Sequence, residues 1–285
     1  MVASSATGSS QWIIRATRPV AFVTTAIFAA MTYALFTGAT WVVDAFPWPE
    51  SPMSLVFLAS ISASIGVVWL GIALEDEPAA LAGVGVNVIV ASFGACLLLA
   101  QQAWIMSRVD LWMGAAGSAA SGAFGVWLWR AARRIEVSDP RPMPAIVRWA
   151  FMFFVVALVI AGSALVLQVQ AFPWRLWDQT ATLFGFVFLG AAAYFAHTVI
   201  SGRWSFAAPA LWGFLAYDVV LFVPYFKMLF ADAGTTDVFY GGAPVNRTSL
   251  VIFLAVLTVS ALLTLYTALL HPTTRLWSTR PAQPM

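Results

Sequence analysis

The tetrapeptide Ala45-Phe46-Pro47-Trp48 occurs a second time as Ala171-Phe172-Pro173-Trp174, 126 residues further along the chain. Each copy follows one long apolar segment and precedes another. Tryptophan favours the membrane–water interface and proline fixes a turn, so each copy is expected to form a short loop at a membrane surface. The recurrence predicts that the chain is duplicated, with one half in residues 1–139 and the other in residues 140–285.

The composition around these loops is that of an integral membrane protein. Hydrophobic residues make up 61% of the 285 residues and charged residues only 9%, whereas a soluble domain carries about 25% charged residues. The net charge of +2 comes from arginines scattered over short loops, which argues against a nucleic-acid partner. The single cysteine, Cys96, excludes an intrachain disulfide and a cysteine-based zinc site.

Eight apolar segments have the length that a membrane-spanning helix requires, about 20 residues. They cover residues 19–43, 51–74, 78–107, 111–129, 149–174, 179–202, 204–230 and 248–274. The sequence therefore predicts an all-α integral membrane protein with eight transmembrane helices, four in each half. Because four is an even number, the two halves have the same orientation and form a parallel repeat about an axis near the membrane normal.

The arginines predict the orientation of these helices. If the N-terminus is cytoplasmic, ten arginines lie on the cytoplasmic side and three on the outer side, as the positive-inside rule requires. Both termini are then cytoplasmic, and we expect the protein in the cell membrane. The inner set is Arg15, Arg18, Arg130, Arg133, Arg134, Arg141, Arg148, Arg203, Arg275 and Arg280, and the outer set is Arg108, Arg175 and Arg247.

The two loops also carry a resemblance to a known group of proteins. Residues Phe46-Pro47-Trp48-Pro49-Glu50-Ser51-Pro52 and Phe172-Pro173-Trp174-Arg175-Leu176-Trp177, each followed by a helix, resemble loops of uncharacterised prokaryotic multi-pass membrane proteins built of two four-helix halves. The resemblance implies that architecture and no particular activity.

Asp218 is the acidic residue placed deepest in an apolar segment, about 21 Å along a helix that begins at Trp204. A charge at that depth costs roughly 2.5 to 3.5 kcal/mol and is a functional-site hypothesis by default. Together with Tyr217 and the Val220 carbonyl, which Pro224 leaves without its amide donor, Asp218 could hold a proton or a small cation. Ser163 and Thr258 are expected at comparable depths. A protonated aspartic acid that only fixes helix packing is the alternative interpretation.

The two histidines, His197 and His271, both fall near cytoplasmic helix ends, so an axial pair for one b-type haem is conceivable. Histidines at helix ends are also common without any metal, and no cofactor is the first expectation.

Three functions follow from these features. The first is a non-enzymatic scaffold or accessory subunit that contacts membrane lipids and binds other membrane subunits or a lipid-like ligand. The second is a proton or small-solute transporter that uses Asp218. The third is a haem-bearing electron-transfer subunit that uses His197 and His271.

Overall fold

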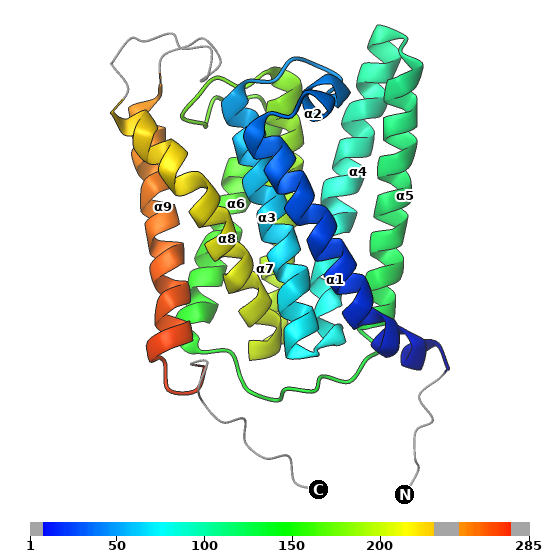
Figure 1. Ribbon diagram of the computed structural model, residues 1–285, viewed down its shortest axis with the longest axis vertical. Coiled ribbons are helices and arrows are strands. Elements are labelled where there is room, and N and C mark those ends of the chain that lie inside the picture. The colour runs from blue at the N-terminus through cyan, green and yellow to red at the C-terminus, as the bar shows by residue number, and fades with distance from the viewer. Residues whose placement is uncertain (1–7, 231–244, 275–285) are drawn as a thin grey trace, which may run out of the picture.

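The computed structural model describes residues 8–230 and 245–274, and among these residues it contains helices and no β-strand. Of the described residues, 82% are helical. Its long helices run close to the long axis of the molecule and form one bundle (Figure 1). They are α1 (Gly8–Thr37), α3 (Pro52–Glu75), α4 (Leu81–Met106), α5 (Val109–Ala132), α6 (Ala145–Val166), α7 (Asp178–Ser201), α8 (Trp204–Leu229) and α9 (Arg247–Leu265).

Three short elements complete the described chain. Helix α2 (Thr40–Ala45) follows α1, a 3-10 turn η1 (Pro78–Ala80) precedes α4, and a π-helical turn η3 (Tyr266–Leu270) continues α9. The sequence predicted one span over residues 19–43, but α1 ends at Thr37 because Gly38 takes a left-handed conformation with φ +64°. The residues that follow form α2 instead.

Seven of the long helices are long and apolar enough to cross a membrane. The eighth expected span, residues 111–129, forms the 24-residue helix α5 but is not among the seven. Its six glycines and serines lower its hydropathy. They are Gly114, Gly117, Ser118, Ser121, Gly122 and Gly125.

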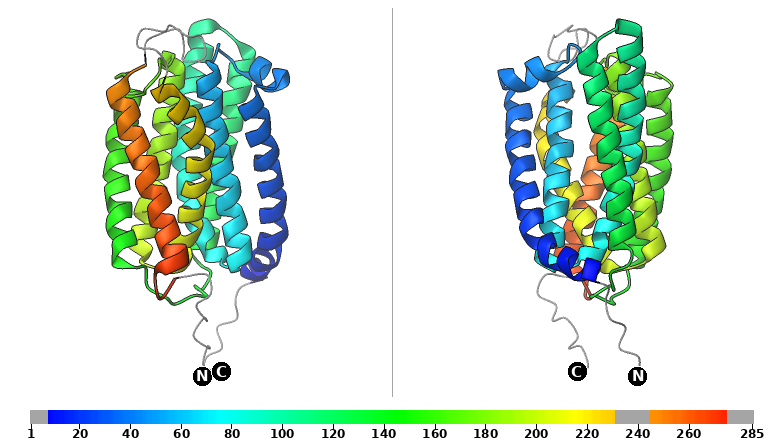
Figure 2. Two further views of the ribbon diagram at one scale, coloured as in Figure 1. Left: turned by 60° about the vertical axis from the view of Figure 1, so that its left-hand side comes forward. Right: turned by 90° about the vertical axis from the view of Figure 1, so that its right-hand side faces the viewer.

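Each of the four central helices packs against a central neighbour and one outer helix. In the centre α3 packs along α8, and α4 packs along α7. The outer helices α1, α5, α6 and α9 pack on α3, α4, α7 and α8 respectively, as the two turned views let the reader follow (Figure 2). Consecutive helices of each half therefore pair first with second and third with fourth.

Small residues let two of these pairs approach closely. A β-carbon at Gly85 of α4 would lie 2.8 Å from the Gly125 carbonyl oxygen of α5. A β-carbon at Gly162 of α6 would lie 2.9 Å from the Gly185 carbonyl oxygen of α7. Both distances are shorter than real β-carbon contacts, so any larger side chain at either glycine would push the helices apart.

An aromatic cluster fills the seam between the halves at the end away from the start of α1. Phe57 of α3 lies at its centre, with ring centroids 5.0 Å from Phe172 and 4.7 Å from Phe184. Aromatic residues of both halves thus pack together in this part of the seam.

Candidate functional site

Asp218 is buried between α8 and α9, with 3% of its surface exposed. The Ser260 hydroxyl of α9 lies 2.6 Å from Asp218 Oδ2 and 3.0 Å from the Leu257 carbonyl oxygen of its own helix. Asp218 Oδ1 is buried and has no hydrogen-bond partner among the described residues. One carboxylate oxygen is therefore paired across the helix interface and the other is free to accept a donor.

A stripe of buried hydroxyls continues from Ser260 along α9. Thr264 donates to the Ser260 carbonyl oxygen at 3.0 Å and lies 3.2 Å from the Leu211 carbonyl of α8, and Thr267 lies 2.9 Å from the Thr264 carbonyl. These hydroxyl protons are directed at backbone carbonyls, a common way to satisfy Ser and Thr inside helices. A carbonyl oxygen does not release a proton onward, so the stripe joins helices and does not by itself form a proton relay.

The hydrogen bond to Asp218 that the structure shows comes from Ser260, and the other predicted residues also have contacts of their own. Tyr217 faces α3, where its ring lies 5.9 Å from Phe57. Val220 packs against a cluster built from α1, α2 and α3. Thr258 is exposed and donates to the Leu254 carbonyl oxygen of its own helix at 2.8 Å.

Ser163 is half-buried on α6, and the partner of Asp218 is instead Ser260, which the sequence analysis missed. Ser260 lies two residues beyond Thr258 on α9. The sequence carries a usable signal, since Leu257, Ser260 and Thr264 follow a helical spacing that forms one buried face.

The two histidines have separate surroundings. His197 of α7 lies beside Gly83 of α4, and its ring is 5.9 Å from Phe206. His271 lies after η3, where its Nδ1 is 3.2 Å from the hydroxyls of Thr273 and Thr274. Within residues 8–230 and 245–274, no group of three or more His, Cys, Asp or Glu residues is placed to hold a metal ion.

The two repeated tryptophans make reciprocal contacts across the seam between the halves. Trp48 Nε1 lies 3.0 Å from the Thr180 hydroxyl at the start of α7, and Trp174 Nε1 lies 3.2 Å from the Ser54 hydroxyl at the start of α3. Trp48 and Trp174 are 126 residues apart, and so are Ser54 and Thr180. The two contacts are therefore equivalent: Thr180, the partner of Trp48, and Ser54, the partner of Trp174, are separated by the same 126 residues as the tryptophans.

Contacts between the central helices deeper in the bundle are also related by a shift of 126 residues. A β-carbon at Gly213 of α8 would lie 3.1 Å from the Ser64 carbonyl oxygen of α3, and one at Gly190 of α7 would lie 3.0 Å from the Asn87 carbonyl oxygen of α4. Adding 126 to Ser64 gives Gly190, and adding 126 to Asn87 gives Gly213. The helix limits agree as well, since Pro52–Glu75 becomes Asp178–Ser201 under the same shift.

Glu50 lies where Trp48 contacts Thr180, and the residue 126 positions later is not acidic. Trp48 Nε1 donates to Glu50 Oε1 at 2.7 Å, and the Thr180 hydroxyl donates to the same oxygen. Glu50 Oε2 is buried and has no hydrogen-bond partner among the described residues. Burial raises the pKa of the Glu50 carboxyl, while hydrogen bonds from Thr180, Trp48 and Ser54 oppose that rise.

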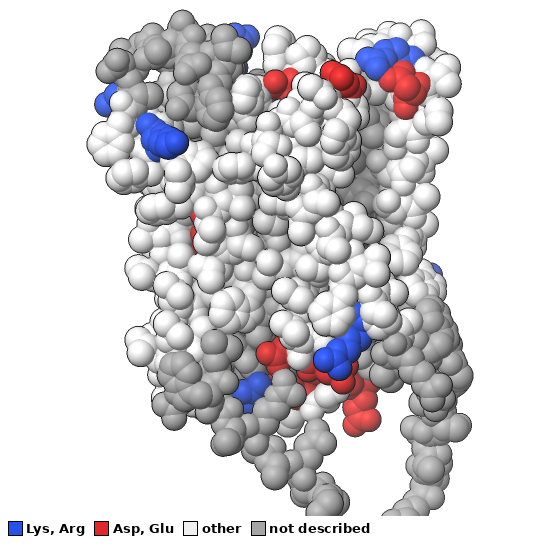
Figure 3. All heavy atoms as spheres, in the orientation of Figure 1, with Lys and Arg blue, Asp and Glu red and all other residues white. Residues whose placement is uncertain are grey.

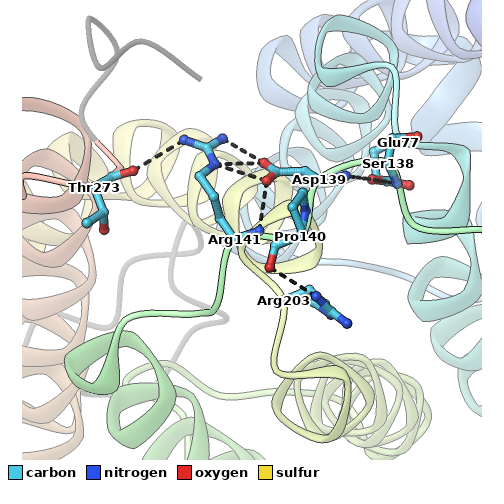
Figure 4. Close-up of polar contacts among 7 residues, drawn as sticks. All are labelled: Glu77, Ser138, Asp139, Pro140, Arg141, Arg203 and Thr273. Carbon is cyan, nitrogen blue, oxygen red and sulfur yellow. Dashed lines mark hydrogen bonds and ion pairs between the residues drawn. The ribbon is translucent and has the colours of Figure 1, made fainter. Parts of the chain in front are cut away.

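The connection between α5 and α6 lies at the opposite end of the bundle (Figure 1), and Figure 4 shows the polar contacts that hold it. Glu77 Oε2 accepts hydrogen bonds from the backbone amides of Ser138 at 2.9 Å and Asp139 at 3.1 Å. Arg203, 126 residues after Glu77, donates to the Pro140 carbonyl oxygen at 3.0 Å. Two residues 126 positions apart, one acidic and one basic, thus hold neighbouring parts of the connection.

Arg141 adds a further contact on this connection. Its guanidinium forms an ion pair with Asp139 at 2.7 Å and donates to the Thr273 carbonyl oxygen beyond η3. The connection is therefore tied to the ends of α3, α8 and α9 rather than left as a free linker.

Charged side chains on the face shown in Figure 3 gather at the two ends of the bundle, and the band between them is largely uncharged. At one end the Arg108 guanidinium forms an ion pair with Asp110 and donates to the Pro47 carbonyl oxygen at 2.9 Å. At the other end Arg133 lies 4.7 Å from the ring centroid of Trp129. This distribution is that of a protein that spans a membrane.

Comparison with models of protein families, with curated proteins and with solved structures found no significant match. The structure by itself supports a multi-pass helical membrane protein, and any more specific role has to be argued from its residues.

Proposed function

We propose that this protein is a non-enzymatic membrane subunit that binds a helix of another membrane protein along the outer face of α5. The observation that carries this proposal is the exposure of small residues on that face. Ala116, Gly117, Ala120 and Ser121 are exposed, whereas the opposite face of α5 is buried against α4. Small side chains at helical spacing allow the backbone of a second helix to approach closely in lipid.

Two further features support binding at this face. Met113 and Phe124 are exposed at the two ends of the small-residue strip, with 71% and 51% of their surfaces accessible, so bulky groups flank a shallow centre. A β-carbon at Gly117 would meet no other atom within 4 Å. Gly117 therefore has room beside it for another molecule, which supports a partner helix at this face.

Leucine substitutions at two exposed alanines, one on α5 and one on α9, test the proposal. We expect Ala120→Leu to release a partner subunit or second copy during purification in mild detergent, because the larger side chain keeps the helices apart. Ala255→Leu, the same change at an exposed site on α9, serves as the control. Native mass spectrometry measures both, and equal retention of the partner in the two variants would contradict the proposal.

The proposed setting is the cell membrane, with eight spans, two parallel four-helix repeats and both termini in the cytoplasm. The reciprocal contacts of Trp48 and Trp174 support the repeat, and the arginines at the ends of α5 and α7 support the orientation. Cysteine labelling at Ser4 tests the orientation on a Cys96→Ser background. Labelling of Ser4 from outside the cell would contradict it.

A second candidate function is proton or small-cation movement through Asp218. The specific observation in its favour is that buried Oδ1 has no partner among the described residues. Asp218→Asn keeps the size of the side chain and its bond to Ser260 but removes the charge. We expect this variant to abolish pH-driven solute or proton flux in proteoliposomes if Asp218 carries it, while Ser260→Ala retains flux at a lower rate. Unchanged flux in Asp218→Asn would reject this role.

The haem alternative at His197 and His271 remains open to a direct test. A visible spectrum of the protein purified from its native membrane would carry a b-type haem band if the histidines bind haem. Lipid-like ligands would be identified in the same sample by mass spectrometry of extracted small molecules.

A further inference from the structure

The tryptophan seam, formed by Trp48 with Thr180 and by Trp174 with Ser54, contains two equivalent contacts, but Glu50 takes part in only one of them. Trp48 reaches Thr180, and Trp174 reaches Ser54, so the seam is built twice. Glu50 enters only the first contact. Its counterpart 126 residues later is Leu176, which is 6% exposed and packs in the aromatic cluster. The equivalent position in the second half thus holds an apolar side chain, and the carboxyl group is particular to Glu50.

The donors around Glu50 are unevenly shared between its two oxygens. Oε1 accepts from Trp48 of its own half and from Thr180 of the other half, and the Ser54 hydroxyl also lies against the carboxyl group. Buried Oε2 accepts no hydrogen bond among the described residues. An ionised carboxylate in this place keeps one oxygen desolvated and unpaired, which is costly. A proton on Oε2 removes the charge and leaves both donors on Oε1 undisturbed.

The other charged groups near the seam do not replace this proton. Arg108 donates to the Pro47 carbonyl oxygen of the loop, and its guanidinium forms an ion pair with Asp110. Arg175 and Asp178 of the other half are both exposed. On the inner side the Trp174 ring is 5.9 Å from Tyr225 of α8, which carries no charge at neutral pH.

We infer that Glu50 is a proton-binding site shared by the two halves, and that binding a proton there strengthens their docking at this end of the bundle. Burial raises the pKa of the Glu50 carboxyl. A carboxyl whose pKa is raised on folding contributes its full stability below the pKa of the unfolded chain and loses it as the pH rises through the folded value. The halves are therefore held more tightly in acid than at neutral pH.

Replacement by glutamine tests this inference, because Glu50→Gln imitates the protonated side chain. We expect the apparent unfolding temperature of Glu50→Gln to match that of the unchanged protein in acid and to exceed it increasingly toward alkaline pH. Asp44→Asn, which removes an exposed carboxyl at the same end of the bundle, is the control. A difference for Glu50→Gln that does not vary with pH would overturn the inference.

Infrared difference spectra between acid and neutral pH give a second measurement, independent of unfolding. We expect the carbonyl band of one protonated carboxyl to be present in the unchanged protein and in Asp44→Asn and absent in Glu50→Gln. If this carbonyl band were still present in Glu50→Gln, the inference would also be overturned.

Thr180→Val keeps the test available if Glu50→Gln does not fold. This variant removes a donor that favours the ionised carboxylate, so the infrared titration should move to higher pH. Thr182→Val is its control, because the half-buried Thr182 donates to the Asp178 carbonyl oxygen of its own helix. Equal titrations in the two variants would show that the seam does not govern this proton.

Discussion

Glu77 shows how one carboxylate can anchor a segment that the sequence places far from it. It is 1% exposed and binds two backbone amides of the connection, while its Oε1 is buried and has no partner among the described residues. Burial raises the pKa of the Glu77 carboxyl, and the amide hydrogen bonds oppose that rise. Its position explains why an acidic residue belongs at an end of the bundle that is otherwise rich in arginine.

Glu77→Gln should therefore change how stability depends on pH. Since the pKa of Glu77 is raised in the folded protein, the unchanged protein loses stability as the pH rises above about 4.5, the usual range of a glutamate. The glutamine variant should lose less over the same range, because its oxygen still accepts from Ser138 and Asp139. Unfolding measured at several pH values checks this, with Asp76→Asn as an exposed neighbouring control.

Glu77→Leu is the contrasting variant. It removes the oxygen that accepts from the Ser138 and Asp139 amides, so it should be less stable than the glutamine variant, which keeps that oxygen. If leucine proved as stable as glutamine at every pH, the proposed role of these hydrogen bonds would be wrong.

Helix α5 uses its small residues on two faces for different purposes. Gly125 packs on α4, where an added β-carbon would lie 3.0 Å from the Gly85 carbonyl oxygen. Gly117 lies on the exposed face and has no neighbour within that reach. The same residue type therefore sets the α4–α5 distance on one side and leaves room for another molecule on the other.

Replacing each glycine by alanine separates the two faces. Gly125→Ala should destabilise the protein by about 1 to 3 kcal/mol, because a rigid backbone atom opposes the new methyl group. Gly117→Ala should stabilise the isolated chain by as much as about 1 kcal/mol through helix propensity. Chemical unfolding in detergent measures both changes. A loss of stability in Gly117→Ala equal to that in Gly125→Ala would mean that the exposed face is packed in solution.

At the scale of the whole molecule, helices of one half pack directly against helices of the other, in addition to the covalent connection between α5 and α6. α3 packs along α8, and α4 packs along α7, so each central helix has a partner from the other half. The tryptophan seam closes one end of these pairs, and Glu77 and Arg203 hold the connection at the other.

Two separately produced pieces, residues 1–139 and 140–285, should consequently assemble when they are expressed together in one membrane. The expected result is co-purification of both pieces through a tag on one of them. Thr180→Val combined with Ser54→Ala removes both hydroxyls of the seam and should reduce the yield of the complex. Pieces that insert but do not associate would show that the covalent connection is essential to the fold.

The amino-acid sequence by itself determined the membrane class, the positions of the long helices and the recurrence at 126 residues. These properties depend on local composition, since about 20 apolar residues must form a helix in lipid wherever they lie in the chain. Only tertiary structure decided the pairings. The rotation and depth of α9 brought Ser260 rather than Thr258 to Asp218, and the folding of one half onto the other brought Thr180 to Glu50 and Trp48. A contact between residues 132 positions apart depends on how helices pack, and no local pattern in a single sequence specifies that packing.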